Sequence, residues 1–322
     1  MTIPSVTSVP VPPPPVGRLA PSPTGLLHLG HARTFLIAWW HLRVRGGRVL
    51  LRFEDLDGQR CRQDFIDSTL SDLEWLGLDW DGSPEIQSTR LQAMKEKVAA
   101  LLDEGRAYPC VCTRGDLRRA LSAPHRGDRE MPYPGTCRGR FPSIAAARRA
   151  GCEPVVRFTV PAGAVSFHDA VFGRQTFNVA SECGDFVIAR RDANIGYQLA
   201  VVLDDARQGI TEVHRGADLL PSTARQLLLQ EALRLPRPRW VHLPLVVDGS
   251  GRRLAKRSDD LSMRELRNRG VEARDVVGWV ASSVGMDAPH GGSAAELTPL
   301  FDLDLIHPGD VPAPICPWPS RG

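Results

Sequence analysis

The early part of the chain alternates apolar segments with a polar loop, in the order strand, loop, helix, strand. Residues 16–20 (VGRLA) form a short apolar segment, and 21–30 (PSPTGLLHLG) has the Pro and Gly content of a loop. Residues 31–45 are apolar and aromatic and end at a Gly-Gly pair, which predicts a helix, and 48–53 (RVLLRF) predicts the next strand. This order predicts a βαβ unit, whose ligand site lies at the carboxyl ends of the strands.

Two more helices are predicted from the spacing of apolar residues and from their end signals. Apolar side chains recur at helical spacing within 64–78, at Ile66, Leu70, Leu73 and Leu76. A second helix is predicted over 88–105, opened by Ser88 or Thr89 and closed by Gly105.

The pattern changes in the middle of the chain. Cys, Arg, Gly and Pro dominate 108–160, which predicts an insertion outside the sheet. Strand-like segments resume between 165 and 205, including DFVIARRD (185–192) and YQLAVVLDD (197–205). The later pattern predicts, in chain order, a helix over 221–235, a strand and a Gly/Arg/Lys loop over 240–260, two short helices over 263–286, and weak periodicity after about 290.

Composition narrows the class of protein. Hydrophobic residues make up 42% and charged residues 24%, as in ordinary globular proteins, and no apolar run reaches the ~20 residues that cross a membrane. The Pro-rich N-terminus has no secretory signal pattern, and the seven cysteines are an odd number, so we expect reduced thiols in a cytoplasmic protein. A net charge of +3 permits a nucleic-acid partner without requiring one.

Two histidines lie where the first loop leads into the first helix. His28 and His31 are three residues apart, so they share a face at the helix entrance, and Gly30 between them lets a ligand approach the backbone. Helix starts bind phosphate through backbone N–H groups, which makes this loop a candidate phosphate site. Alone, the pattern also fits one capping histidine and one packed histidine.

Four ordered blocks of the sequence resemble class I aminoacyl-tRNA synthetases of the glutamyl branch. The first, R-x-A-P-S-P-T-G-x-L-H-x-G-H-x-R-T, starts at Arg18 and contains the motif called HIGH in that class. LRFEDLD with Arg60 resembles the second block, and 195–229 resembles the third. RRLAKRSDD resembles the KMSKS loop, with Lys256 as its second lysine and Arg253 in place of its first.

The resemblance implies activation of an amino acid by ATP. The carboxylate of L-glutamate attacks the α-phosphate of ATP, which is bound with Mg²⁺, and gives glutamyl-adenylate and pyrophosphate. Charge builds up on the phosphate oxygens, so preorganised donors are the main requirement. The resemblance assigns this role to His28, His31 and Lys256, with Gly30 also binding ATP.

A pocket for glutamate needs a partner for its side-chain carboxylate, and the bidentate guanidinium of arginine suits this. By resemblance, Arg18 and Arg215 lie in this pocket, Glu54 faces the α-amino group and Tyr197 adds a hydroxyl. The first loop completes the pocket with Leu19, Ala20, Pro21 and Ser22. Outside this context, Arg215 fits a surface ion pair and Glu54 a solvated acid at a strand end.

Three cysteines of the insertion have metal-ligand spacing. Cys110 and Cys112 form a C-x-C pair and Cys137 follows in a second loop, whereas Zn²⁺ takes four ligands in a tetrahedron. His125 is the chemically ordinary fourth candidate, and the family resemblance suggests Tyr133. We expect one structural zinc that holds the insertion near the RNA acceptor; the alternative is three reduced cysteines without metal.

The length after the KMSKS-like loop bears on the substrate. A full glutamyl-tRNA synthetase continues into a helical anticodon-binding domain, but only about 65 residues follow Arg257 here, so we expect no such domain. This shorter form with a C-x-C…C insertion resembles glutamyl-queuosine tRNA(Asp) synthetases. That resemblance implies activation of glutamate without tRNA, and its transfer to the queuosine base at the wobble position of tRNA(Asp).

Three other functions compete with this interpretation. A minimal glutamyl-tRNA synthetase would charge a tRNA 3′ end, a non-catalytic paralogue would only bind RNA or a partner, and a small-substrate adenylyltransferase would share only the first loop. Arginines crowd the insertion and the C-terminal helices, which fits contact with an RNA backbone, although a high-G+C genome also uses arginine as its default surface cation.

The expected fold is α/β, a Rossmann-type parallel-sheet catalytic domain split by a zinc-bearing insertion. We expect a cytoplasmic monomer whose partners are ATP, L-glutamate and tRNA(Asp) carrying queuosine, with no membrane contact. The expected division is a disordered lead-in (1–16), the first catalytic half (17–107), the insertion (108–190), the second catalytic half (191–245), the KMSKS-type loop with a helical stem-contact region (246–290) and a C-terminal tail (291–322).

Overall fold

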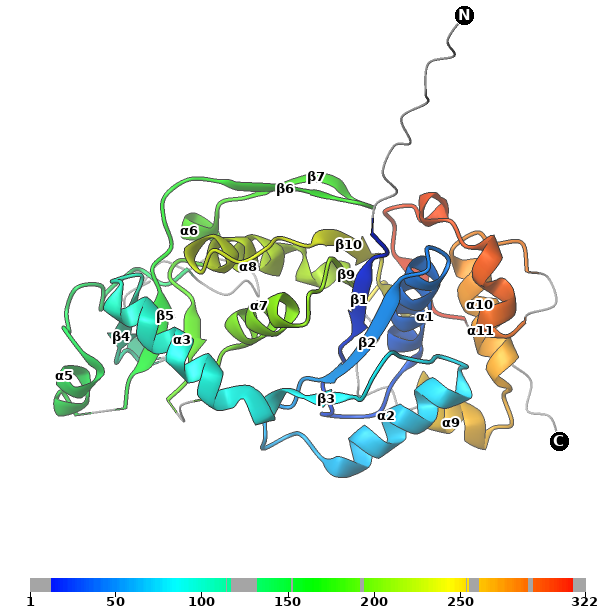
Figure 1. Cartoon of the computed structure of the whole chain (residues 1–322), viewed down its shortest axis with the longest axis horizontal. Helices are drawn as coiled ribbons and strands as arrows, with labels where there is room; N and C mark the ends of the chain where they lie inside the picture. The colour runs from blue at the N-terminus through cyan, green and yellow to red at the C-terminus, as the bar shows by residue number, and fades with distance from the viewer. Residues whose placement is uncertain are drawn as a thin grey trace, which may run out of the picture.

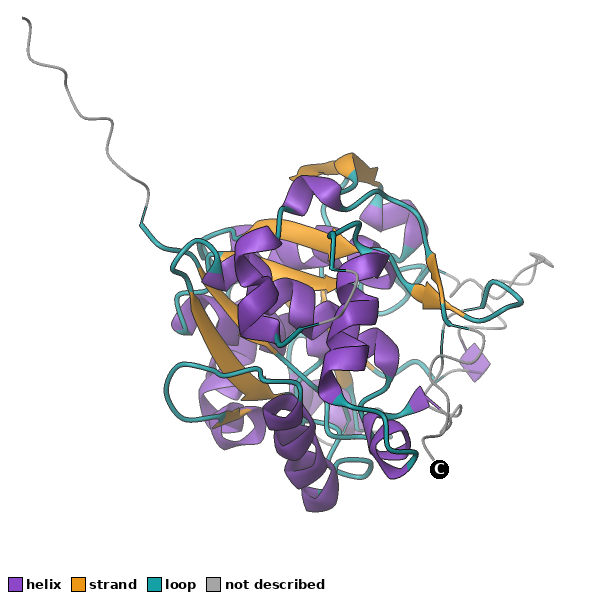
Figure 2. Ribbon diagram, turned by 90° about the vertical axis from the view of Figure 1, so that its right-hand side faces the viewer, coloured by secondary structure: helices purple, strands orange, loops and turns teal. Residues whose placement is uncertain are grey.

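In the computed structural model of the chain, helices flank a parallel sheet, and the insertion lies at one end of the molecule (Figure 1). Seen after a turn of 90° about the vertical axis, the strands run through the centre of the molecule, with helices on both sides (Figure 2). The residues that the structure describes are 13–113, 115–116, 132–151, 153–191, 194–252, 254, 261–288 and 292–314.

The first half of the sheet is the predicted βαβ unit with a third strand added. β1 (Val16–Leu19) pairs in parallel with β2 (Arg48–Phe53), which pairs in parallel with β3 (Glu85–Ile86). The crossover helix α1 (Leu29–Arg43) is buried on most of its surface, because it packs against the sheet on one side and C-terminal helices on the other. This explains why apolar residues occur on several sides of the helix and not in a single stripe.

The second half starts from the other side of β1. β9 (Glu212–Gly216) pairs in parallel with β10 (Arg239–Leu243), and the Thr211 N–H donates to the Val16 carbonyl at 2.8 Å. β9 therefore lies beside β1, and the chain builds outward from β1 in both directions. Ligands bind at this kind of reversal in strand order.

One predicted strand is a helix. Residues 197–205, interpreted as strand-like, form most of α7 (Tyr197–Arg207), which packs against α8 (Leu220–Ala232). The buried Leu199 and Val202 are three residues apart and lie in the hydrophobic core that α7 shares with α8. The strand prediction was wrong here because a short apolar run does not distinguish a strand from a buried helix.

The insertion has a sheet of its own. β4 (Ala107–Cys110), β5 (Val155–Phe158) and β8 (Val187–Ala189) form three antiparallel strands, away from the parallel sheet (Figure 1). The hairpin of β6 (Val165–Asp169) and β7 (Gly173–Phe177) returns to the catalytic half. There the end of β6 lies beside β10, so Asp169 reaches the parallel sheet.

Most of the remaining helices lie where the sequence predicts them. The predicted helix over 88–105 instead starts with a 3-10 turn over Gln87–Arg90, because Ser88 donates to the Asp55 carboxylate from both its N–H and its hydroxyl. The other bounds are α2 (Gln63–Trp75), α3 (Leu91–Asp103), α5 (Ile144–Arg149), α6 (Val179–Glu182), α9 (Met263–Asn268) and α10 (Ala273–Ser283).

The segment after residue 291, where periodicity is weak, packs into the hydrophobic core around α1. The Trp40 indole donates to the carbonyl of Ala294 at 2.8 Å, and the ring of Phe301 lies 6.0 Å from that of Trp40. This segment contains α11 (Ala294–Leu297), two 3-10 turns (Thr298–Leu300 and Leu303–Leu305) and β12 (Val311–Pro312), which pairs in parallel with β11 (Val246–Val247).

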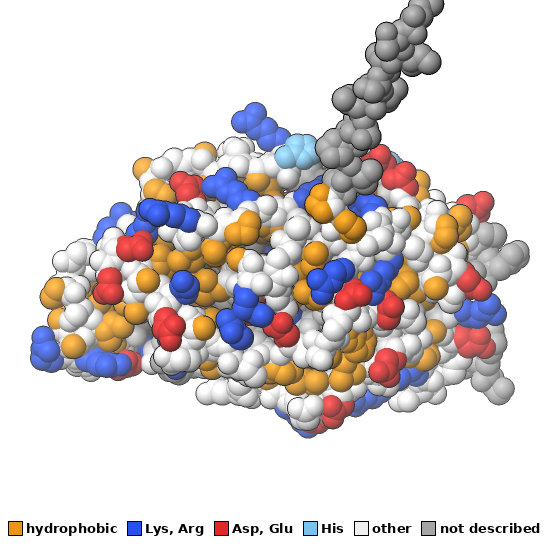
Figure 3. All heavy atoms as spheres, in the orientation of Figure 1, with side chains coloured by type: hydrophobic (Ala, Val, Ile, Leu, Met, Phe, Trp, Pro, Cys, Tyr) orange, Lys and Arg blue, Asp and Glu red, His pale blue; other side chains and the backbone are white. Residues whose placement is uncertain are grey.

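The surface carries charges of both signs. Lysine and arginine are interspersed with aspartate and glutamate over the face in Figure 3, in keeping with the net charge of +3. Among the residues that the structure describes, no helix has the length and apolar content that crossing a bilayer requires.

A buried histidine pair joins α1 to β9. His41 Nδ1 lies 2.7 Å from Nε2 of His214 and 3.7 Å from the carboxylate of Glu212. Burial lowers the pKa of His41 to about 4, with Arg45 adding to the effect, and burial lowers the pKa of His214 well below its usual range. Both imidazoles are therefore neutral in the folded protein at neutral pH.

We predict that the free energy of unfolding falls as the pH drops from about 6.5 towards 4. In this window the unfolded chain binds a proton at His41 and the folded chain does not, which costs about 1 kcal/mol between pH 7.5 and 5.5, and the lowered pKa of His214 acts in the same direction. Urea unfolding at both pH values measures this. His41→Gln should weaken the pH dependence, whereas replacing the exposed His168 with glutamine should not change it. Equal pH dependence in the wild type and His41→Gln would contradict the assignment.

Candidate active site

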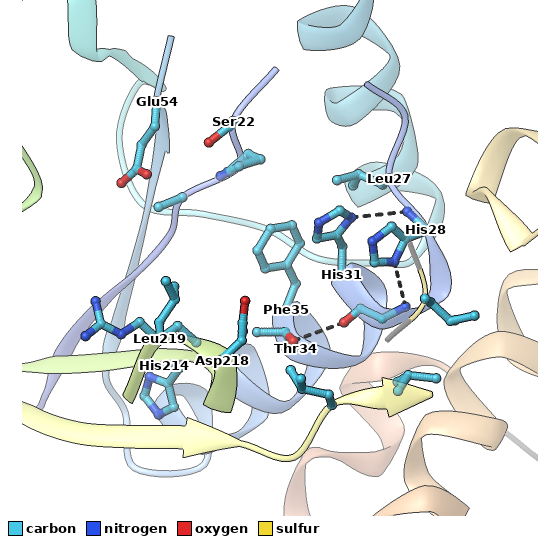
Figure 4. A pocket seen from close by; sticks show the side chains of 18 of the residues that line it. Ser22, Leu27, His28, His31, Thr34, Phe35, Glu54, His214, Asp218 and Leu219 are labelled. Carbon is cyan, nitrogen blue, oxygen red and sulfur yellow. Dashed lines mark hydrogen bonds between the residues drawn. The ribbon is translucent and has the colours of Figure 1, made fainter. Parts of the chain in front are cut away.

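A cavity of about 360 Å³ lies at the reversal of strand order, next to the carboxyl ends of β1 and β9 (Figure 4). It brings together most of the residues predicted to bind ATP or glutamate. Those that line it are Arg18, Ala20, Pro21, Ser22, His28, Gly30, His31, Glu54, Tyr197 and Arg215. Leu19 differs, because its side chain is fully buried in the hydrophobic core.

The two histidines of the first loop build the start of α1. His28 is the N-cap, and its Nδ1 accepts from the Gly30 N–H at 3.1 Å, while Nδ1 of His31 accepts from the His28 N–H at 3.3 Å. Their rings stack with centroids 3.7 Å apart (Figure 4). An Nδ1 that accepts a hydrogen bond leaves the ring proton on Nε2, so both rings are Nε2–H donors. Capping and phosphate binding are thus compatible.

Lys256 lies outside the described residues, but both flanks of its loop are attached to the first loop or the cavity wall. Leu254 lines the cavity, and its N–H donates to the carbonyl of Val246 at 3.0 Å. On the other side, the Met263 N–H donates to the carbonyl of Leu27 at 2.8 Å, one residue before the cap of α1.

A chain of four buried charges crosses the floor of the cavity. Arg18 Nε and Arg52 NH1 lie 3.1 and 2.8 Å from the same oxygen of Asp205. NH2 of Arg52 lies 3.0 Å from the carboxylate of Glu54. The order of charges is plus, minus, plus, minus, so Arg18 and Glu54 are held at opposite ends of one network.

Asp205 and Arg52 are functional candidates that the sequence analysis missed. Burial alone would raise the pKa of Asp205, but the guanidiniums of Arg18 and Arg52 hold it below its usual range. Burial raises the pKa of Glu54, and Arg52 opposes this rise. The available signal was that both residues lie inside the blocks that resemble synthetases, Arg52 in LRFEDLD and Asp205 in the third block.

Arg215 differs from Arg18 because its partners are neutral. Nε lies 3.0 Å from Nε2 of His242, NH1 donates to Gln226 Oε1 at 2.8 Å, and NH2 donates to Thr223 Oγ1 at 2.7 Å. The guanidinium also lies over the Trp240 ring, 4.9 Å from its centroid. Among the described residues no carboxylate forms an ion pair with it, so the surface ion pair considered for Arg215 does not occur.

This neutral surrounding makes Arg215 an uncompensated cation. Its residue is only 5% exposed, and burial lowers its pKa. A buried charge is costly unless it is paired. The cavity wall at Arg215 is therefore suited to an anion brought in by a ligand.

A second cavity of about 250 Å³ adjoins the first. The two cavities share Ser22, Glu54 and Tyr197. The second continues along the loops after β2 and β3 to the edge of the insertion, where Arg190 lines it. A molecule held there would lie beside a ligand in the first cavity.

The three cysteines of the insertion converge on the Tyr133 hydroxyl. Sγ of Cys112 and Sγ of Cys137 are 3.5 Å apart, and the tyrosine oxygen lies 3.3 Å from Sγ of Cys110 and 3.7 Å from Sγ of Cys112. At a Zn–S distance of about 2.3 Å, tetrahedral ligands are about 3.8 Å apart, so these donors could hold a metal ion. His125, the other candidate, lies outside the described residues.

A known family matches most of the chain. Residues 16–286 match the family model described as tRNA synthetases class I (E and Q), catalytic domain. A protein of Symbiobacterium thermophilum, named Glutamyl-Q tRNA(Asp) synthetase, is 46% identical over 310 residues, which covers 92% of this chain and 96% of the relative. A relative of the same name from Nitratidesulfovibrio vulgaris is 46% identical over 279 residues, and this match covers 84% of this chain and 86% of the relative.

The chain belongs to the glutamyl-Q tRNA(Asp) synthetases, within class I. A solved structure of Elizabethkingia meningosepticum, a glutamate tRNA ligase in complex with its amino acid, has the same fold, with a TM-score of 0.79 and 26% identity. The match covers 93% of this chain and 67% of that ligase. As a member of this synthetase family, the chain has the α/β catalytic domain with a parallel sheet that the sequence predicts.

Proposed function

We propose that this protein activates L-glutamate with ATP, without tRNA, and transfers it to the queuosine base at the wobble position of tRNA(Asp). The observation that carries the proposal is Arg215, a buried cation without an anionic partner, in one cavity with the imidazoles of the first loop. The names of two relatives matched over 96% and 86% of their lengths support the acceptor. An adenylyltransferase with only the first loop in common would need no such cation.

Glutamate binding follows from the charges of the cavity. The side-chain carboxylate of glutamate pairs with Arg215 and Arg18, and the α-ammonium group pairs with Glu54. Tyr197 adds a hydroxyl to the same wall. Because Arg18 already has Asp205 as a partner, Arg215 supplies most of the uncompensated charge.

The first reaction forms a bond between a glutamate carboxylate oxygen and the α-phosphorus of ATP, and pyrophosphate leaves with the electron pair of the broken P–O bond. The Nε2–H groups of His28 and His31 and the N-terminus of α1 donate to the phosphate oxygens as charge develops. Lys256 adds a cation from its loop. Mg²⁺ accompanies ATP and neutralises part of its charge.

The second reaction moves the glutamyl group to a hydroxyl of the queuosine cyclopentene-diol. The hydroxyl oxygen attacks the carbonyl carbon of glutamyl-adenylate, AMP leaves with the bonding pair, and the hydroxyl proton is released. The second cavity adjoins the glutamate site through Ser22, Glu54 and Tyr197, which supports it as the place of the acceptor.

Arg190→Ala should separate the two reactions. We predict that transfer of glutamate to the RNA falls about 10-fold or more, because a donor to the acceptor is lost, while glutamate-dependent ATP–pyrophosphate exchange stays within about twofold. Initial rates of both reactions measure this. Arg174→Ala, at an exposed position of β7, is the matched control and should change neither rate. Equal losses in both reactions would contradict the placement of the acceptor.

The cysteine cluster is proposed as a structural zinc site held by Cys110, Cys112, Tyr133 and Cys137. Its distances support Tyr133 as the fourth ligand. Burial raises the pKa of Cys112 to about 12, so this thiol keeps its proton until a metal ion displaces it. Zinc would fix the insertion near the RNA and take no part in the chemistry.

Gly184→Ala should reduce the zinc content. Gly184 has φ +67°, and a Cβ there would overlap the backbone of Tyr133. We predict that purified Gly184→Ala holds less than half of the zinc of the wild type, measured by plasma emission. Gly209→Ala is the control, because Gly209 has the same φ of +67° with open space around it. A full zinc content in Gly184→Ala would show that Tyr133 does not need its present position.

We also propose the division of the chain at residues 16, 107, 190, 245 and 290, with a short helical region after the KMSKS-like loop. ATP and tRNA are substrates of the cytoplasm, and the cysteines of the proposed zinc site require reducing conditions. We therefore propose a cytoplasmic location, and the monomeric state and the lack of membrane contact stay predictions from the sequence.

The attachment position tests the proposal against a minimal glutamyl-tRNA synthetase. Queuosine-containing tRNA(Asp) is trimmed of its 3′-terminal adenosine, and labelled glutamate is supplied with ATP. Transfer to the trimmed RNA at the normal rate is expected, because the acceptor is the base. Loss of transfer on trimming would move the acceptor to the 3′ ribose and overturn the proposal.

A further inference from the structure

The protons around Arg215 can be assigned from its contacts. Nε–H donates to Nε2 of His242 at 3.0 Å, and Thr223 Oγ1, which accepts from Arg215 NH2, lies 3.2 Å from the same nitrogen. Arginine N–H groups only donate, so Nε2 of His242 accepts from Arg215, and the Thr223 hydroxyl can therefore only donate to the same nitrogen. Nε2 of His242 therefore acts only as an acceptor and carries no proton, so the ring proton is on Nδ1.

Asp169 fixes this tautomer from the opposite side. Its Oδ2 accepts from the Nδ1–H of His242 at 2.6 Å and from the His242 backbone N–H at 3.0 Å. Its Oδ1 accepts from the backbone N–H groups of Val171 and Phe172 at 3.0 and 2.9 Å. All four partners are donors, and both side chains are fully buried. Only an ionised carboxylate satisfies this arrangement.

The consequence for Arg215 is a fixed orientation. Of the five N–H groups of a guanidinium, His242, Gln226 and Thr223 take three. One N–H remains on each terminal nitrogen, on the side where the Tyr197 hydroxyl also hydrogen-bonds to the guanidinium, and a bidentate carboxylate accepts two such N–H groups. Gln226 is itself held by Gln198, whose Oε1 accepts from the Gln226 amide at 2.9 Å.

We propose that Asp169 and His242 are positioning residues that aim Arg215 at the side-chain carboxylate of glutamate. The inference rests on the proposed function, in which Arg215 binds that carboxylate. Asp169 ends β6, in the hairpin that returns from the insertion, so the glutamate pocket is completed by a residue far from the synthetase-like blocks in sequence. Neither residue lines the cavity.

Asp169→Asn is the sharpest change, because an amide has one donor end and one acceptor end. Turned towards Val171 and Phe172, its NH₂ would meet two backbone donors. Turned towards His242, it meets one backbone donor and favours the tautomer with the proton on Nε2. The proton on Nε2 would then face the Nε–H of Arg215, so the hydrogen bond between them is lost and the guanidinium is no longer held by His242.

The test measures glutamate-dependent ATP–pyrophosphate exchange without RNA. For Asp169→Asn we expect the KM for glutamate to rise about 10- to 50-fold and the KM for ATP to stay within about twofold. His242→Gln can still offer an acceptor oxygen to Arg215, so its KM for glutamate should rise less than that of His242→Ala. Asp185→Asn is the matched control.

Asp185 is also a buried carboxylate of the insertion and accepts from the Val160 N–H and the Tyr108 hydroxyl, but it has no link to Arg215. Asp185→Asn should therefore have a lower melting temperature than the wild type and an unchanged KM for glutamate.

Two results would overturn the inference. One is an unchanged KM for glutamate in Asp169→Asn or, where that variant does not fold, in His242→Ala. The other is an equal rise of both KM values in Asp169→Asn and in Asp185→Asn, which would make the network merely structural. A wild type without glutamate-dependent exchange would instead overturn the proposed function, and this inference with it. The two results that overturn the inference alone can be observed only if the wild type is active, so they are distinguishable from failure of the proposed function.

Discussion

Replacing Arg215 with glutamine should raise the KM for glutamate in ATP–pyrophosphate exchange by about 100-fold or more, with little change in the KM for ATP. Arg215 is buried, its partners are neutral, and its charge is the part of the cavity that a carboxylate would compensate. Removing one member of a buried, hydrogen-bonded charge pair costs about 2–5 kcal/mol. Glutamine keeps the polar contacts to Gln226 and Thr223 in part but loses the charge and the fork.

Arg33→Gln is the control for the loss of a buried arginine. Arg33 is 2% exposed and has neutral partners, Ser283 and the carbonyl of Pro244, but it does not line the cavity. This variant should lower the melting temperature and leave the KM for glutamate within about twofold. An Arg215→Gln enzyme with a normal KM for glutamate would exclude Arg215 from the glutamate pocket.

His31→Ala should lower the turnover rate of glutamate-dependent exchange by about 100- to 1000-fold. The Nε2–H of His31 is one of few donors on the phosphate side of the cavity, and loss of one preorganised donor raises such a barrier by about 3–4 kcal/mol. The substitution also removes the acceptor for the His28 N–H, which weakens the start of α1 by about 1 kcal/mol.

His31→Asn separates the two effects. An asparagine oxygen can accept from the His28 N–H, so the stability of α1 should recover, but its short amide cannot occupy the position of Nε2. We expect slow exchange from both variants and a melting temperature close to that of the wild type only for His31→Asn. Near-normal turnover in either variant would remove His31 from the phosphate site.

The frame of the sheet could be predicted from sequence because its signals are local. Residues 16–53 contain strand, loop, helix and strand in one continuous pattern, and β1, α1 and β2 follow it within a few residues. Residues 197–205 misled because a buried helix and a buried strand share a short apolar run. The segment after 291 has weak periodicity, yet Ala294 and Phe301 pack in the core through contacts with Trp40, which no local pattern encodes.

In the candidate site, too, only part of the residues could be predicted from sequence. The cavity contains the residues that the sequence motifs single out, including Glu54, Tyr197 and Arg215. Their supports were not predictable, because Asp205 and Asp169 meet Arg18 and His242 across 187 and 73 residues of sequence. Such pairs depend on strand order and register, which a single sequence does not specify.

The RNA that accepts glutamate can be identified in one experiment. Labelled glutamate and ATP are supplied with three RNAs in parallel: tRNA(Asp) carrying queuosine, tRNA(Asp) lacking it, and tRNA(Glu). Label on the first RNA alone is the predicted result. Label on tRNA(Glu), or equal label on both forms of tRNA(Asp), would contradict transfer to queuosine and make the protein a synthetase that charges a tRNA end.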